Sequence, residues 1–209
     1  MQREWASPKG AGLYFSIILR PQFPQSAWPL LTLMAAVAVH DALLDVCALE
    51  TDIKWPNDIL VNEKKLAGIL AETVEAVSGR AVVVGIGINL TNPSGNSFPS
   101  QFDREATSVE VATGKKPELE VVLAALVALL GSYYQTLQQP GEPDQILREW
   151  CLRSSYCEGK RIRVVESNGS FTGTTRGLEC DGALRVETDG GEMRIVRAGD
   201  VTAVRAVSA

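Results

Sequence analysis

The alternation of apolar and polar positions predicts a β-sheet in the first half of the chain. In residues 12–20, "GLYFSIILR", the large apolar side chains at odd-numbered positions fall on one face of a strand. Residues 80–90, "RAVVVGIGINL", show the same alternation, with Val and Ile at the even-numbered positions. Residues 53–70 predict a short strand, a Pro-Asn-Asp bend and a hairpin that turns near Asn62 and Glu63.

Helices are predicted where apolar residues recur every three or four positions. The expected helices cover residues 25–46, 106–114, 118–138 and 143–154. The first is apolar nearly all round, which is typical of a buried helix, and Gln25 or Ser26 is its expected N-cap. The second is expected to end at Gly114.

The sequence pattern changes after Gly159. Residues 160–201 contain short β-rich runs separated by Asn-Gly, Asp-Gly and Gly-Gly turns, as in a small β-barrel. Residues 91–101 are rich in Asn, Pro, Ser and Gly and predict a loop. We therefore expect two domains, residues 1–158 and residues 159–209.

Composition and charge narrow the class of protein. The chain has 209 residues, of which 45% are hydrophobic and 22% charged, as in a soluble globular protein. Its net charge of −5 argues against a general nucleic-acid binder, which normally presents a basic face. Uninterrupted apolar runs fall short of the roughly 20 residues that span a membrane, so no membrane contact is expected.

The cysteines do not suggest a metal site. Cys47, Cys151, Cys157 and Cys180 form no CxxC pair, and His40 is the single histidine. No protein-held metal is expected. All four cysteines are predicted to be thiols, as is usual in a cytosolic protein.

One face of the strand at residues 80–90 is unusually bare. Gly85 and Gly87 share it with Asn89, and Gly68 in the hairpin arm is a second bare position. Two glycines on one face suggest that a ligand approaches the sheet closely, or that a helix packs tightly on it.

Lys54 begins the bend "KWPND" beside these strands. A lysine leaving a sheet needs an anionic partner, because an unpaired buried ammonium is costly. Pro56 fixes the backbone, and Asn57 and Asp58 supply turn hydrogen bonds. Lys54 is thus placed to meet a phosphate or carboxylate, although a surface lysine beside an ordinary turn fits the pattern as well.

An ordered set of motifs resembles the biotin protein ligase family. These motifs are "REWASPKGAGLYFSIILRP", "KWPND", "KKLAGIL", "GIGIN" and "TRGLECDGALRVE", and together they cover almost the entire chain. The resemblance implies an α+β fold, in which a mixed sheet with packed helices is followed by a small C-terminal SH3-like barrel. Members of the family activate biotin with Mg-ATP to biotinyl-5′-AMP and transfer it to a lysine of biotin carboxyl carrier protein.

The resemblance also implies site residues and partners. Biotin, ATP and Mg²⁺ would be the small molecules bound, in a cytoplasmic enzyme without nucleic-acid or membrane partners. A homodimer is one assembly that the resemblance allows. Lys54 would lie between the biotin carboxylate and the α-phosphate. The implied site residues are Lys54 as catalytic; Arg3, Tyr14, Lys54 and Gly68 around biotin; and Trp5, Asn89 and Arg205 around the nucleotide.

The chain departs from the family at its start. The adenylate loop, of the form GRGRxxRxW, is represented only by Arg3 and Trp5, and the preceding biotin-holding segment and any helix-turn-helix are missing. We expect Met1 to be an internal methionine of a longer ligase, and the chain as written to be weak or inactive. Two alternatives stay open: a lipoate or octanoate ligase or transferase of the same fold, and a non-catalytic biotin-binding remnant.

Overall fold

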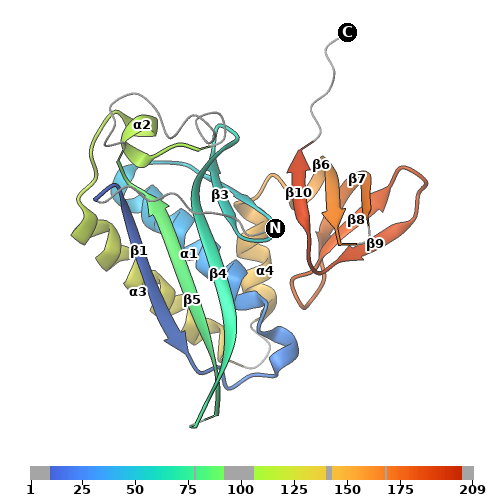
Figure 1. The fold of residues 1–209 in the computed structure, drawn as a ribbon, viewed down its shortest axis with the longest axis horizontal. Helices are drawn as coiled ribbons and strands as arrows, with labels where there is room; N and C mark the ends of the chain where they lie inside the picture. Colours follow the sequence, from blue (N-terminus) through green and yellow to red (C-terminus); the bar gives the residue numbers. More distant parts are fainter. Residues whose placement is uncertain (1–9, 78, 92–105, 140–142, 168, 204–209) are drawn as a thin grey trace.

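The computed structural model describes residues 10–77, 79–91, 106–139, 143–167 and 169–203, and these form two sheets with helices beside the first (Figure 1). The first sheet has the order β1-β5-β4-β3-β2. Its strands are Gly12–Leu19 (β1), Asp52–Lys54 (β2), Asp58–Val61 (β3), Lys64–Ala76 (β4) and Gly79–Asn89 (β5). Every named pair is antiparallel, and the parallel component is an isolated bridge between Lys65 and Ala106. The predicted α+β class is confirmed.

The two faces of the first sheet differ as the alternation predicted. A buried apolar row crosses all five strands through Leu13, Ile88, Ala67, Ile59 and Ile53. Helix α1 lies against this face, and α3 and α4 lie against α1, so these three helices lie on the same side of the sheet (Figure 1). The helices are Leu30–Cys47 (α1), Val109–Thr113 (α2), Leu119–Leu137 (α3) and Pro143–Leu152 (α4).

Helix α1 is buried as expected, but its predicted N-cap is wrong. The helix begins at Leu30 after Pro29, and the expected cap residues Gln25 and Ser26 lie in a separate 3₁₀ turn, η1 (Gln25–Ala27). Proline suits a helix start, because the first turn leaves its N–H groups without intrahelical acceptors. Helix α2 ends at Gly114, whose φ of 71° confirms the predicted terminus.

Two helical segments are long and apolar enough to cross a membrane by length and composition alone, namely Gln25–Cys47 and Leu119–Leu137. The first is the core helix of the fold, with 67% of its most apolar window buried inside the protein. The second packs on α1 through one face and buries only 17% of its window. Counting uninterrupted apolar residues underestimates the apolar length of both segments, because a single polar residue ends a run without lowering the mean hydropathy of the segment much.

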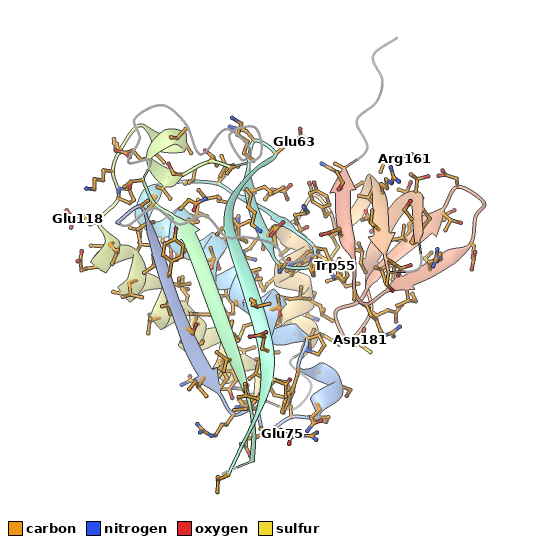
Figure 2. The ribbon with its side chains drawn as sticks, in the orientation of Figure 1. Trp55, Glu63, Glu75, Glu118, Arg161 and Asp181 are labelled. Carbon is orange, nitrogen blue, oxygen red and sulfur yellow. A yellow bond between two sulfur atoms is a disulfide. The ribbon has the colours of Figure 1, made fainter. Side chains whose placement is uncertain are left out.

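The second sheet has the order β10-β6-β7-β8-β9 and is antiparallel throughout. Its strands are Glu158–Glu166 (β6), Gly169–Leu178 (β7), Leu184–Thr188 (β8), Met193–Val196 (β9) and Asp200–Ala203 (β10). The β7–β8 turn rests on α1, since a Cβ on Gly182 would lie 2.9 Å from Leu33 Cδ1. Trp55 joins the two sheets, because its buried indole Nε1 donates to the Gly182 carbonyl at 3.0 Å (Figure 2).

The segment that joins α4 to β6 supports the free edge of β2. Ile53 N donates to the Arg153 carbonyl at 3.1 Å, and Ser154 Oγ donates to the Ile53 carbonyl at 2.5 Å. A disulfide between Cys151 and Cys157 closes this segment. The prediction that all four cysteines are thiols is therefore wrong for this pair. Its Cα atoms lie 5.1 Å apart because the chain turns between them, with Cys157 N donating to the Ser154 carbonyl at 3.2 Å.

Candidate active site on the open face of the sheet

A single cross-strand row collects most of the predicted site residues that the structure describes. Directly paired residues of an antiparallel sheet place their side chains on the same face. In strand order, the row contains Tyr14, Gly87, Gly68, Asp58 and Lys54. It lies on the face opposite α1, so three predicted residues that are far apart in sequence, Tyr14, Gly68 and Lys54, share one surface.

The glycines leave the middle of this face bare. The neighbouring row pairs Gly85 with Ser16 and Leu70, and Leu70 is 58% exposed. A Cβ on Gly85 would meet only Ser16 Oγ at 3.5 Å and the Leu70 carbonyl at 3.7 Å, which are ordinary contacts. No helix among the described residues packs on this face. Within the described part of the chain, a tightly packed helix is therefore not the reason for the glycines, and the surface around Gly85 has room for a ligand.

The bend after β2 holds Lys54 through contacts on several strands. Asn57 joins β4 twice: its Nδ2 donates to the Ile69 carbonyl at 2.7 Å, and its own carbonyl accepts from Ile69 N at 3.0 Å. The peptide bond between Trp55 and Pro56 is cis. The Lys54 ammonium lies 3.3 Å from Asp58 Oδ2, and its side chain is only 22% exposed. Lys54 is thus a partly buried cation on a braced strand, not a surface lysine beside a loose turn.

A second lysine, which the sequence patterns did not single out, lies beside Lys54. Lys65 Nζ is 2.5 Å from Asp58 Oδ1, so one carboxylate is shared by two ammonium groups. The motif "KKLAGIL" contains Lys65, but only the register of β3 against β4 brings it to Asp58.

The remaining predicted residues fall at the margins or outside the described chain. Tyr14 is 41% exposed, and its ring lies over Gly12, where a Cβ would collide with it. Asn89 is buried, and its Nδ2 donates to the Thr107 carbonyl at 3.1 Å, which fixes the segment before α2. Arg3, Trp5 and Arg205, and most of the predicted loop at 91–101, lie outside the described residues.

Acidic groups surround the Lys54 end of the row. Burial, and then the negative charges of Asp52, Glu63 and Asp58, raise the pKa of Tyr156 to about 12, so its hydroxyl stays protonated at neutral pH. Within the ranges that the structure describes, no group of three or more His, Cys, Asp or Glu side chains is arranged to hold a metal ion.

A cavity of about 820 Å³ opens where the bend faces the second sheet. Pro56 and Asn57 line it on one side, and the ends of β6, β9 and β10 line it on the other, together with the β6–β7 and β9–β10 turns. In this wall, Arg194 pairs with Glu166 at 3.1 Å, and Arg197 pairs with Asp181 at 3.1 Å, so both arginines have a carboxylate partner. The bend that follows Lys54 therefore borders this cavity next to the second sheet.

Comparison with known proteins identifies the family. Residues 1–89 match the biotin/lipoate A/B protein ligase family, and residues 159–202 match the biotin protein ligase C-terminal domain. A biotin–[acetyl-CoA-carboxylase] ligase of Mycobacterium tuberculosis is 32% identical over 208 residues, which is 97% of this chain and 73% of that protein. The chain belongs to the biotin protein ligase family.

Other members of the biotin protein ligase family support the same assignment. The bifunctional ligase/repressor BirA of Bacillus subtilis is 39% identical over 202 residues, which is 95% of this chain but only 60% of that protein. A biotin protein ligase from Aquifex aeolicus, solved in complex with biotin and ATP, superposes with a TM-score of 0.81 at 25% identity. That match covers 98% of this chain and 82% of the Aquifex chain. The second sheet is thus the SH3-like barrel of this family.

Proposed function

We propose that this chain carries the catalytic machinery of an ATP-dependent biotin ligase, which forms biotinyl-5′-AMP and transfers the biotinyl group to a lysine of biotin carboxyl carrier protein. Family membership supports this proposal, as do the relatives from Mycobacterium tuberculosis and Paracoccus denitrificans that are named biotin–[acetyl-CoA-carboxylase] ligases. The observation that carries it is the partly buried Lys54 ammonium. It lies at one end of the cross-strand row that has Gly68 and Gly87 in its middle.

The first step joins two anions, so it needs a fixed cation. The biotin carboxylate attacks the α-phosphorus of ATP, a new carbon–oxygen–phosphorus bridge forms, and pyrophosphate leaves. Lys54 lies between the two anions and lowers their repulsion in the transition state, where charge builds up on the phosphorus oxygens. Gly68 and Gly87 allow the substrate to lie close to the sheet. Mg²⁺ enters with ATP as part of the substrate.

The second step needs no protein nucleophile. The amine of the acceptor lysine attacks the carbonyl carbon of biotinyl-5′-AMP, the amide bond forms, and AMP leaves as the amine loses its proton to water. In this proposal Tyr14 and Arg3 border the biotin, and Trp5, Asn89 and Arg205 border the nucleotide. Residues 1–158 form the catalytic domain, residues 159–209 the barrel domain, and the enzyme works in the cytoplasm.

The test mixes the chain with biotin, Mg-ATP and an apo carrier domain, and follows the intact mass of the carrier. We expect a gain of one biotinyl group, and a rate that falls about 10²- to 10³-fold in Lys54→Met. Lys64→Met is the matched control, because Lys64 lies in the same hairpin and is exposed.

Three results would overturn the proposal. A carrier modified with octanoate or lipoate in place of biotin would favour the lipoate branch of the fold. Biotin binding without biotinyl-5′-AMP formation would favour a non-catalytic biotin-binding protein. Equal rates in Lys54→Met and Lys64→Met would remove Lys54 from the chemistry.

A further inference from the structure

The α4–β6 segment (residues 153–157) holds the first two residues of β2. As described above, Ile53 bonds through its backbone to Arg153 and Ser154. One residue further on, Ser155 donates from its backbone N and from its Oγ to the Asp52 carboxylate, at 2.7 and 2.6 Å. Hydrogen bonds therefore run from three consecutive residues of the segment to the part of β2 that leads into the bend at residues 54–58.

The disulfide closes this segment at both ends. Cys151 lies in the last turn of α4, and Cys157 directly precedes β6. The Cys157 carbonyl also accepts from Gly177 N in β7 at 2.7 Å, so this end is fixed to the second sheet. The residues that hold β2 thus lie inside the loop that the disulfide closes. When the S–S bond is broken, the end of α4 and the start of β6 can move independently.

Two features of the disulfide favour exchange over a permanent structural bond. Its cysteines are six positions apart, and a short loop gains little stability from closure, because the entropy removed from the unfolded chain grows with loop length. Both cysteines also line a cavity of about 500 Å³, which gives a thiolate access to the bond. In the cytoplasm, where the enzyme is proposed to work, disulfides are usually transient or redox-sensing, since glutathione and thioredoxin keep thiols reduced.

We propose that the Cys151–Cys157 pair is a reversible thiol switch that sets how firmly β2 and the bend at residues 54–58 are held. In the disulfide form, the loop is closed and β2 is held. In the dithiol form, the ends of the loop separate and β2 opens more often. This inference rests on the proposed ligase function for its cytoplasmic setting and its kinetic consequence, whereas the coupling of the disulfide to β2 is a property of the fold.

The exchange partner is a dithiol reductant. One of its thiolates attacks Sγ of Cys151, the more exposed cysteine, the S–S bond breaks, and Cys157 leaves as a thiolate that takes a proton from water. The second thiol of the reductant loses its proton and attacks the reductant sulfur of the mixed disulfide, and Cys151 leaves in the same way. Two electrons pass from the reductant, which becomes a disulfide, to the cysteine pair. Oxidised glutathione reverses the reaction through the same intermediates.

The first test equilibrates the folded chain in buffers of defined ratios of reduced to oxidised glutathione. Free thiols are then trapped by alkylation, and the peptides that contain Cys151 and Cys157 are identified by mass. We expect the pair to pass from disulfide to dithiol within the range of glutathione ratios found in the cytosol, whereas structural disulfides resist reduction there. A pair that stays oxidised, or stays reduced, across this whole range would overturn the proposal.

The second test measures hydrogen exchange of the Ile53 amide by NMR in both redox forms. This amide donates to the Arg153 carbonyl inside the closed loop. We expect it to exchange about tenfold faster in the dithiol form, which is within what a short-loop disulfide can contribute. The amides of the edge strand β9 are the control and should not change, since they open by local fraying. Equal rates at Ile53 in the two forms would overturn the coupling.

Two double variants assign the effect to the right thiols. Cys151→Ser with Cys157→Ser should show the faster Ile53 exchange at every glutathione ratio. Cys47→Ser with Cys180→Ser should respond like the parent chain, because these two cysteines are free thiols. A response that disappears with Cys47 and Cys180 would overturn the assignment.

The third test measures pyrophosphate release with biotin and Mg-ATP, and it separates this inference from the proposed function. We expect kcat/KM to fall about threefold on reduction, since a misplacement of about 1 Å can already cost about 10²-fold. If Ile53 responds as expected but neither redox form makes biotinyl-5′-AMP, the ligase proposal fails while the control of β2 stands. If the chain is equally active in both forms, the ligase proposal stands and the switch is overturned.

Discussion

Trp55 is expected to couple the stability of the two sheets. Its side chain is 2% exposed, and its Nε1 donates to the carbonyl of Gly182, which is itself buried in the β7–β8 turn. The substitution Trp55→Phe removes the donor and leaves that carbonyl without this partner, which costs about 1–3 kcal/mol. The smaller ring leaves a void that adds roughly 1 kcal/mol, since complete removal of a buried aromatic side chain costs about 3–5 kcal/mol.

The expected loss of unfolding free energy is therefore about 2–4 kcal/mol. Urea unfolding followed by far-ultraviolet circular dichroism measures it without relying on tryptophan fluorescence. Trp28→Phe is the matched control, because Trp28 is partly buried and its Nε1 donates at 3.3 Å to the nearby Phe23 carbonyl within the same part of the fold. If Trp55→Phe destabilises no more than Trp28→Phe, the coupling through Gly182 is refuted.

Three further predictions concern stability. Gly182→Ala should destabilise the fold more than Gly191→Ala. Both glycines have φ near 80°, so both variants carry a backbone strain of about 1–2 kcal/mol, but only Gly182→Ala would also press a Cβ against α1. Equal unfolding free energies of the two variants would contradict this. Reduction of the Cys151–Cys157 disulfide should lower the unfolding free energy by about 2 kcal/mol, and the Cys151→Ser variant should not respond to reductant. If both cysteines are alkylated before any reductant is added, the disulfide is refuted. Burial lowers the pKa of His40 below its ordinary value of 6.5, so the unfolded chain binds the proton more readily than the folded one. The unfolding free energy should therefore fall as the pH drops below 6.5, and it should fall less steeply in His40→Gln. Parallel pH profiles of the two proteins would contradict this prediction.

Local patterns predicted the faces of the strands and the turns well. The alternation in residues 12–20 and 80–90 identified the buried side of β1 and β5, because every second side chain of a strand lies on the same face. The hairpin turn at Asn62 and Glu63 was also confirmed, and both residues adopt positive φ angles. The bare face formed by Gly85, Gly87 and Asn89 followed from the same periodicity.

Features that depend on distant pairing were not predictable in this way. Lys65 reaches Asp58 only through a bulge in the pairing of β3 with β4, and no alternation rule reveals where a strand carries an extra residue. The Cys151–Cys157 bond joins positions only six residues apart, but it needs the local turn between α4 and β6, which the cysteine spacing alone does not reveal. The row from Tyr14 to Lys54 likewise needs four strand registers at once.

The support of β2 by the α4–β6 segment also determines how this protein can associate with others. An edge strand with free backbone groups is a template for pairing with a second chain. At β2 the backbone N–H and carbonyl of Ile53 are already bonded to Arg153 and Ser154, so this edge is closed to strand addition. Among the described strands of the first sheet, β1 is the edge left for such pairing. A homodimer that extended the described strands of the first sheet would therefore join at β1, at the far end of that sheet from Lys54.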